Sequence, residues 1–192
     1  MILVGYASAH GSTKGIAEEI SRRLIKAGLR AEVRSIEDVR TVETCDAVVL
    51  GSAIHNMKWL PPAATFVRSH ATELSRRPTW LFSVGSLGET SSFLGPRAAK
   101  LFRRMRGDRD TTEMAVFRRA IRPRSHRNFA GAIERAHWNR IGGLFLNAFG
   151  GSYGDHRDGR DVDAWADEIA RELLTTDESR GHRGEVEEQR LP

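Results

Sequence analysis

The chain has 192 residues, of which 40% are hydrophobic and 29% are charged. This composition is typical of one globular domain, and it excludes a fibrous or wholly disordered protein. The lone cysteine, Cys45, cannot form an internal disulfide, no signal-like leader opens the chain, and no apolar run approaches the roughly 20 residues that span a bilayer. We therefore expect a cytoplasmic protein.

The first half of the chain alternates between short apolar runs and stretches with helical periodicity. Strands are predicted at residues 2–7, 30–36 and 47–50, and the second of them is expected at the periphery because its alternation is imperfect. From residue 13 onward, apolar side chains recur at helical spacing until Gly28 ends the helix. Pro61 and Pro62 begin the next predicted helix.

The second half continues this alternation. Further core strands are predicted at residues 79–84 and 128–133, and residues 114–121 fit another strand or ribbon. An amphipathic basic helix is predicted to begin at Pro96, and a closing helix at residues 162–174, introduced by Asp161.

Strands that alternate with helices predict the α/β class, with a doubly wound, five-stranded parallel sheet and helices on both faces. Residues 1–174 would form this single domain. Residues 175–192 are polar and lack an apolar period, so we expect them to be a disordered tail. The connections at residues 91–127 and 137–151 are longer than the minimal pattern needs, which is typical of functional segments.

The clearest motif is the loop between the first predicted strand and the first predicted helix. It reads Ser-Ala-His-Gly-Ser-Thr over residues 8–13, and its glycine lets the chain approach a ligand closely. Unpartnered N–H groups and the helix dipole favour an anion there. The P-loop of nucleotide triphosphatases and the three-glycine dinucleotide motif are both absent. The loop therefore predicts a monophosphate site, with simple helix capping by Ser12 or Thr13 as the alternative.

This strand, loop and helix resemble the start of the flavodoxin superfamily, in which a loop rich in Ser and Thr binds the phosphate of FMN. The resemblance covers residues 1–174 and is strongest to the subgroup that contains menaquinone-dependent protoporphyrinogen oxidase. It is carried there by residues 49–55 (Val-Leu-Gly-Ser-Ala-Ile-His), by the strand at residues 129–133, and by Gly150 and Gly151 before a charged stretch. The resemblance implies a flavodoxin-like fold, one FMN cofactor and an oxidoreductase.

In that superfamily, the loops after the third and fourth strands flank the isoalloxazine ring. Ligands of open α/β sheets also bind outside the carboxyl ends of the strands, at the switch in strand order. Both arguments place the FMN site at three loops. The predicted cofactor-binding residues are Ser8, Ala9, His10, Gly11, Ser12, Thr13, Ser52, Ala53, Ile54, His55, Trp59, Ser83, Val84, Gly85, Ser86, Leu87 and Gly88.

Two of these side chains have specific expected roles, each with a plainer alternative. Trp59 would stack on the flavin or, equally, pack beside the two prolines that follow it. His55 would contact the flavin or the substrate, or lie in solvent. Backbone amides around Ala53 and residues 85–88 would hydrogen-bond to the ring. Because the cofactor itself performs the redox chemistry, no catalytic side chain is assigned.

Three other patterns carry weaker predictions. Residues 136–149 combine large apolar and basic side chains, which suits docking on a membrane or a quinone, or packing as a helix on the sheet edge. The aspartates at 155, 158, 161 and 163 do not follow a calcium-loop order, so we interpret them as turn and cap residues and expect no metal. The arginine-rich residues 97–106 and 118–127 lack a nucleic-acid-binding motif, so no nucleic acid is expected.

The leading function is an FMN-dependent oxidoreductase that passes electrons from a small-molecule substrate, such as a porphyrinogen, to a quinone. A peripheral contact at the inner face of the cell membrane would accompany it. The first alternative is a flavodoxin-type electron carrier, but carriers in that family usually present an acidic docking face, whereas this chain has a net charge of +5. The second alternative is a non-redox module that binds another phosphate ligand. The oligomeric state stays open.

Overall fold

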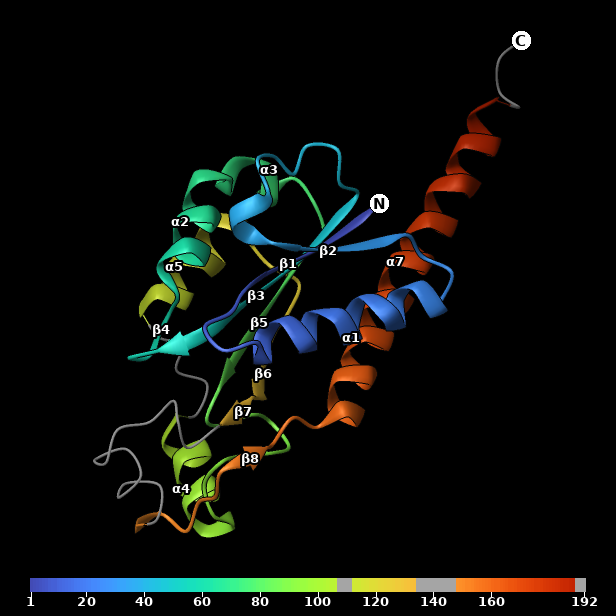
Figure 1. The fold of residues 1–192 in the computed structure, drawn as a ribbon. Coiled ribbons are helices and arrows are strands. Elements are labelled where there is room, and N and C mark those ends of the chain that lie inside the picture. Colours follow the sequence, from blue (N-terminus) through green and yellow to red (C-terminus); the bar gives the residue numbers. More distant parts are fainter. Residues whose placement is uncertain (107–111, 134–147, 189–192) are drawn as a thin grey trace.

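The computed structural model describes residues 1–106, 112–133 and 148–188. Its central sheet has parallel strands in the order β2-β1-β3-β5-β6 (Figure 1). These strands are β1 Ile2–Ala7, β2 Ala31–Ser35, β3 Ala47–His55, β5 Thr79–Gly85 and β6 His126–Ala130. The predicted fold class is confirmed, and β2 lies at the sheet edge as its imperfect alternation predicts.

Helices cover both faces of the sheet (Figure 1). One face carries α1 (Ser12–Lys26) and α7 (Gly159–Glu188). The other carries α2 (Pro61–Ser69), α3 (Ala71–Ser75) and α5 (Thr112–Ile121), next to a short 3-10 helix at Ile36–Asp38. Helix α4 (Pro96–Arg106) lies beyond the carboxyl edge of the sheet. None of the helices in the described ranges has the length and apolar character needed to cross a bilayer.

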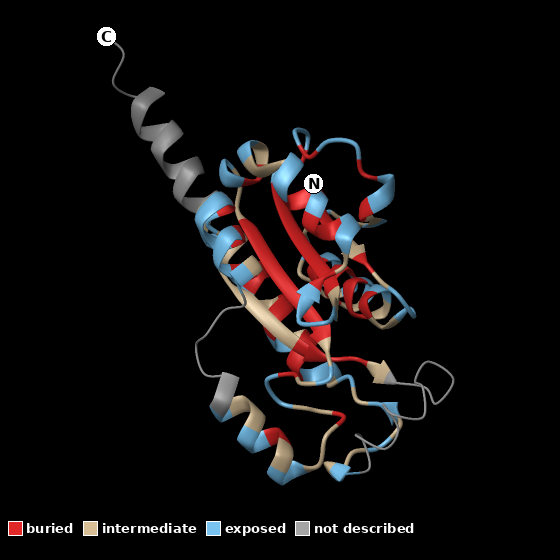
Figure 2. Ribbon diagram, turned by 90° about the vertical axis from the view of Figure 1, so that its left-hand side faces the viewer, coloured by how far each residue is buried: buried red, intermediate tan, exposed pale blue. Residues whose placement is uncertain are grey.

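The packing of the core explains why the sequences of the central strands are continuous apolar runs. Val48 and Leu50 of β3 pack under α2, α3 and α5, whereas Ala47 and Val49 pack under α1 and α7. Both faces of the strand are therefore buried, which Figure 2 shows as red central strands. Each fully buried aliphatic side chain contributes about 1.5–3 kcal/mol, so the packing of the helices on both faces of the sheet is a large stabilising term.

Residues 114–121, predicted as a strand or ribbon, belong instead to helix α5, so that prediction is wrong. The buried side chains of this segment are Met114, Phe117 and Ile121, which recur at helical spacing and form one apolar face. This face packs into the core under α2 and α3. The helical period thus outweighs the β-propensity of the short run around Val116.

The fifth predicted strand, residues 128–133, is divided at Gly131. Strand β6 joins the sheet beside β5, and the next two residues form β7 (Ala132–Ile133), which pairs antiparallel with β8 (Gly154–Asp155). We call this pair the β7–β8 ribbon. Figure 1 shows it below the carboxyl edge of the sheet, near α4.

Helix α7 begins earlier and extends further than the sequence predicts. Asp158, rather than Asp161, caps it, because its Oδ1 accepts hydrogen bonds from the N–H groups of Arg160 (3.1 Å) and Asp161 (3.4 Å). The Asp161 carboxylate pairs instead with Arg127 of β6. The helical backbone continues to Glu188, through most of the predicted tail. Extending an existing helix needs no new nucleus, which favours this continuation.

Candidate functional site

The three loops that the sequence assigns to the site leave neighbouring strands at one edge of the sheet. Ala7 at the end of β1 pairs with Ser52 of β3, and Ser52 pairs with Ser83 of β5. From β1, the chain moves first to β2 on one side and then to β3 on the other, so the strand order switches here. Such a switch point is where open α/β sheets bind ligands. The structure therefore brings the three predicted segments together.

The loop at residues 8–13 makes a tight turn before the start of α1. Gly11 has a φ of 87°, in the left-handed region that favours glycine, and the Ser8 hydroxyl accepts a hydrogen bond from its N–H (2.9 Å). Ala9, His10 and Gly11 are exposed. Helix α1 begins immediately afterwards with no acidic residue in its first turn, so its positive end is not neutralised from within the helix.

The two hydroxyls at the start of α1 have different surroundings. Thr13 is fully buried, and its Oγ1 has no hydrogen-bond partner in the described part of the chain. A buried hydroxyl without a partner is costly, so this atom fits a ligand oxygen. Ser12 Oγ, by contrast, accepts a hydrogen bond from Ala132 N (3.0 Å) and donates one to Ala132 O (3.3 Å). Ser12 therefore fastens the loop to β7.

The loop after β3 projects as a hairpin. Strand β3 continues through Ile54 and His55 and pairs with β4 (Lys58–Trp59). The two turn residues, Asn56 and Met57, both have positive φ (49° and 62°), as a tight two-residue hairpin requires. Met57 is 65% exposed at its tip, and His55 is also exposed. Ala53 and Ile54 are half-buried, so this loop presents backbone and small apolar surface at the edge.

Trp59 packs inside the protein and does not present its ring to a ligand. Its side chain is 3% exposed and meets the Phe117 ring edge-on, at a centroid distance of 5.4 Å. Its indole N–H donates to Ser83 Oγ (2.7 Å), and its backbone N–H donates to Glu113 of α5 (2.9 Å). The buried ring argues against the predicted stacking of Trp59 on a flavin, and the ring contact that the structure shows is with Phe117 of α5.

The hydroxyls of Ser52 and Ser83 are also used within the protein. Ser52 Oγ donates to Ala53 O and accepts from Leu60 N, each at 2.9 Å. Ser83 Oγ accepts from Trp59 and lies 2.8 Å from His126 Nε2. Both serines are buried, so their hydroxyls hold neighbouring segments of the protein together.

The loop after β5 is a compact turn. Phe93 N donates to Ser86 O (2.9 Å), Gly88 N donates to Ser91 O (3.0 Å), and Leu87 forms an isolated bridge with Ser92. Ser86 is exposed and Leu87 is half-buried, whereas Val84 is buried. Gly85 is half-buried at the end of the strand.

The sequence analysis missed two features that position this turn, namely a close backbone approach at Gly88 and two hydrogen bonds from Arg103. A Cβ at Gly88 would lie 2.5 Å from Ala130 N, so only glycine fits against β6 there. Arg103 of α4 donates to Gly88 O (3.0 Å) and to Ser91 O (2.9 Å). Neither contact has a local signal in the sequence, because each joins segments that are distant along the chain.

Charged contacts fasten α1 to α7 behind the loop at residues 8–13. Arg23 donates two hydrogen bonds of 2.6 Å to Asp167 and holds the pKa of that carboxyl below its ordinary value. One turn earlier on α7, Asp163 faces Glu19 of α1, and the hydrogen bond between the two carboxyl groups raises the pKa of Asp163. A hydrogen bond from Arg22 lowers the pKa of Glu19.

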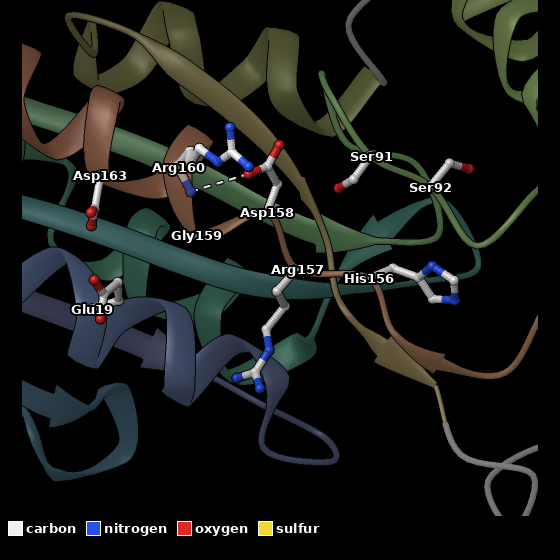
Figure 3. Close-up of a pocket in the computed structure, with 9 residues that line it drawn as sticks. All are labelled: Glu19, Ser91, Ser92, His156, Arg157, Asp158, Gly159, Arg160 and Asp163. Carbon is white, nitrogen blue, oxygen red and sulfur yellow. Dashed lines mark hydrogen bonds between the residues drawn. The ribbon is translucent and has the colours of Figure 1, made fainter.

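A separate open pocket of about 680 Å³ lies between α1, the start of α7 and residues 91 and 92 (Figure 3). It contains none of the predicted site residues. His156 and Arg157, which precede α7, line it, and Arg157 extends from there over the first turns of α1. Most of the basic and apolar segment at residues 136–149 lies outside the described residues.

Comparisons with known proteins agree with this geometry. A family model described as a flavodoxin domain matches residues 3–141. Protoporphyrinogen IX dehydrogenase [quinone] from Escherichia coli strain K12 is 29% identical over 84 residues, which are 43% of this chain and 46% of that protein. The match thus spans less than half the length of this curated relative.

Two solved structures share the fold. Rubredoxin:oxygen oxidoreductase from Desulfovibrio gigas superposes with a TM-score of 0.58 at 14% identity, over 91% of this chain and 36% of that one. A cysteine-to-serine mutant of flavodoxin from Pseudomonas aeruginosa gives a TM-score of 0.53 at 11% identity, over 88% and 96% of the two chains. The predicted resemblance is confirmed, and FMN is the cofactor that it indicates.

Proposed function

The chain belongs to the flavodoxin domain family, and from this premise we propose that it is an FMN-dependent oxidoreductase whose cofactor phosphate binds at residues 8–13. The observation that carries the proposal is the buried Thr13 hydroxyl, which has no partner in the described residues and lies in the first turn of α1. A phosphoryl oxygen would satisfy it, and the positive end of helix α1 would favour the charge of the phosphate. When bound, FMN supplies the redox chemistry.

The other two loops would hold the ring end of the cofactor. Residues 53–55 and 85–87 are exposed or half-buried at the same edge, and the contact between Trp59 and Ser83 fixes the spacing of the two loops. His55 is exposed on the hairpin, where it can meet the cofactor or a substrate. In this proposal, the protein binds and orients, and the side chains of Ser12, Ser52 and Ser83 support the loops.

We further propose a porphyrinogen as the electron donor and a quinone as the acceptor. The matched 84 residues of the quinone-linked protoporphyrinogen IX dehydrogenase support this assignment. The net charge of +5 also suits a substrate with carboxylates, or a peripheral contact with the anionic inner face of a cell membrane where a quinone would be met.

The first experiment is an absorbance spectrum of the purified protein after FMN has been added and the unbound ligand removed. A retained flavin spectrum supports the cofactor assignment, and no retention at excess FMN contradicts it. The second experiment measures anaerobic oxidation of protoporphyrinogen IX with a menaquinone analogue as acceptor. If the FMN-loaded protein reduces no quinone but exchanges electrons with redox proteins, it is a carrier and the substrate assignment is wrong.

A further inference from the structure

Arg157 lies where an arginine does not serve the stability of the nearest helix. In the sequence it comes two residues after the end of β8, and its guanidinium extends over α1 (Figure 3). Its Nη1 stands against Gly15, in the position that a Cβ at residue 15 would occupy. Gly15 N donates to Gly11 O (3.0 Å), so Gly15 lies one turn below the loop at residues 8–13, about 5.4 Å along the helix axis.

A cation at the amino end of a helix is unfavourable because it faces the positive end of the helix dipole. Helix α1 offers no acidic residue in its first turn to offset this. The ion pair of Arg157 with Asp155 lies on the surface, with the side chains 36% and 52% exposed, and such a pair adds little stability. The position of Arg157 therefore suits the binding of an anion better than the folding of the chain.

Asp155 holds the guanidinium in a defined orientation. Its carboxylate accepts from Arg157 Nε (2.9 Å) and Nη2 (2.5 Å), and this hydrogen bonding lowers the pKa of Asp155. Nη1 makes no hydrogen bond to any described residue. The guanidinium group of Arg157 is planar. Because Asp155 binds the Nε and Nη2 side of it, the Nη1 side faces α1.

The β7–β8 ribbon also ties Arg157 to the loop itself. Ser12 exchanges two hydrogen bonds with Ala132 of β7, and β7 pairs with β8, where Ala132 lies opposite Asp155. Gly131, just before β7, approaches Ser12 so closely that a Cβ there would lie 3.3 Å from Ser12 Cβ. The loop and the arginine are thus held by the same two-stranded element.

We propose that Arg157 is a specificity-determining residue for the anionic end of the flavin, and that its Nη1 makes the protein select FMN over riboflavin. This inference rests on the proposed function, because it assumes that the flavin phosphate binds at residues 8–13. Asp155 is the positioning residue that presents the guanidinium. Gly15 is required because any side chain there would displace it.

The test compares FMN with riboflavin, which lacks the phosphate. Apoprotein is titrated with each flavin, and quenching of flavin fluorescence gives the two Kd values for wild type, Arg157→Gln and Gly15→Ala. Both variants should bind FMN about tenfold more weakly, as expected for one lost charge-assisted hydrogen bond, with riboflavin binding unchanged. Gly15→Ala keeps the arginine and improves helix propensity, so a loss of FMN affinity there reports the displaced guanidinium.

Arg160→Gln is the matched control. Arg160 lines the same pocket and carries the same charge but lies at the start of α7, so its variant should bind both flavins as wild type does. Equal weakening of FMN and riboflavin in Arg157→Gln, or no change in either, overturns the role of Arg157. If wild type prefers FMN and the variants keep that preference, only this inference fails. If wild type binds no FMN, the proposed function fails with it.

Discussion

The indole N–H of Trp59 donates to the hydroxyl of Ser83 across 2.7 Å, inside the protein and between the two loops that flank the proposed ring site. Trp59 lies at the end of the hairpin after β3, and Ser83 lies near the end of β5. The contact therefore fixes the distance between the two loops without placing an aromatic ring in the site. Ser83 extends the link to His126 of β6.

Replacing Trp59 should affect stability far more than flavin binding. Trp59→Phe removes the donor and some volume, and Trp59→Leu also removes the aromatic ring, so we expect losses in the free energy of unfolding of about 1–3 and 3–5 kcal/mol, respectively. Urea unfolding of the apoprotein measures these values. The FMN Kd of folded Trp59→Leu should stay within about threefold of wild type, a difference of less than about 0.7 kcal/mol. A Kd weakened about a hundredfold, or roughly 2.8 kcal/mol, would restore the stacking role.

Thr13→Val should separate binding from stability. Valine has the shape of threonine without the hydroxyl, so the apoprotein should be unchanged or more stable by about 1 kcal/mol, because a buried polar atom without a partner is removed. FMN should bind about tenfold more weakly. Thr13→Ser, which keeps the hydroxyl, is the control for binding. A less stable Thr13→Val apoprotein with normal FMN affinity would show that the hydroxyl serves the fold.

Ser12→Ala should destabilise the apoprotein, in contrast to Thr13→Val. It removes both hydrogen bonds to Ala132, leaving the Ala132 N–H and carbonyl without this partner. We expect the apoprotein to lose about 1–2 kcal/mol in the free energy of unfolding. Exchange of the Ala132 amide hydrogen, followed by NMR, should become faster. Unchanged protection of that amide would contradict the fastening role.

Gly88→Ala should destabilise the turn after β5, whereas Gly85→Ala should be tolerated. A Cβ at Gly88 would lie 2.5 Å from the backbone nitrogen of Ala130, which cannot move without shifting β6. At Gly85, the nearest atom would be Ile54 Cβ at 3.5 Å, an ordinary contact. Thermal unfolding of the two apoproteins should differ by about 2 kcal/mol, in the range of overpacking. Equal melting temperatures would mean that the turn is loosely held.

Two aspartates one turn apart on α7 should respond to pH with opposite signs. The hydrogen bond from Arg23 lowers the folded-state pKa of Asp167, so its stabilisation is present above the unfolded pKa of about 3.9 and is lost as the pH falls through the lower folded value. Asp167→Asn should therefore be less stable than wild type at about pH 7, and the difference should shrink as the pH falls below about 4. Denaturant unfolding across this pH range measures it.

Asp163→Asn is the matched variant. Because Glu19 raises the folded-state pKa of Asp163, its ionised form is disfavoured by folding at neutral pH. The amide should thus leave the protein as stable as wild type at neutral pH, or more stable. A loss there equal to that of Asp167→Asn would show that the ion pair of Asp163 with Arg23 outweighs its contact with Glu19.

The sequence by itself determined the parallel sheet and the position of the candidate site. Residues 2–7, 47–50 and 79–84 are apolar on both faces, and only a sheet covered by helices on both sides buries such runs. The loop at residues 8–13 could be recognised because its chemistry is contained in consecutive residues. The carboxyl ends of parallel strands meet at one edge, so the meeting of the three loops also followed.

Only the tertiary structure decided which side chains face that edge. The polar groups of the side chains of Trp59, Ser52 and Ser83 form hydrogen bonds inside the protein. Among the buried hydroxyls near the site, only that of Thr13 has no hydrogen-bond partner in the described residues. Arg157 reaches Gly15 from a distant part of the sequence, through the β7–β8 ribbon. Local periodicity reports which face of an element is buried, but not which distant residue meets it, because that depends on how the elements pack.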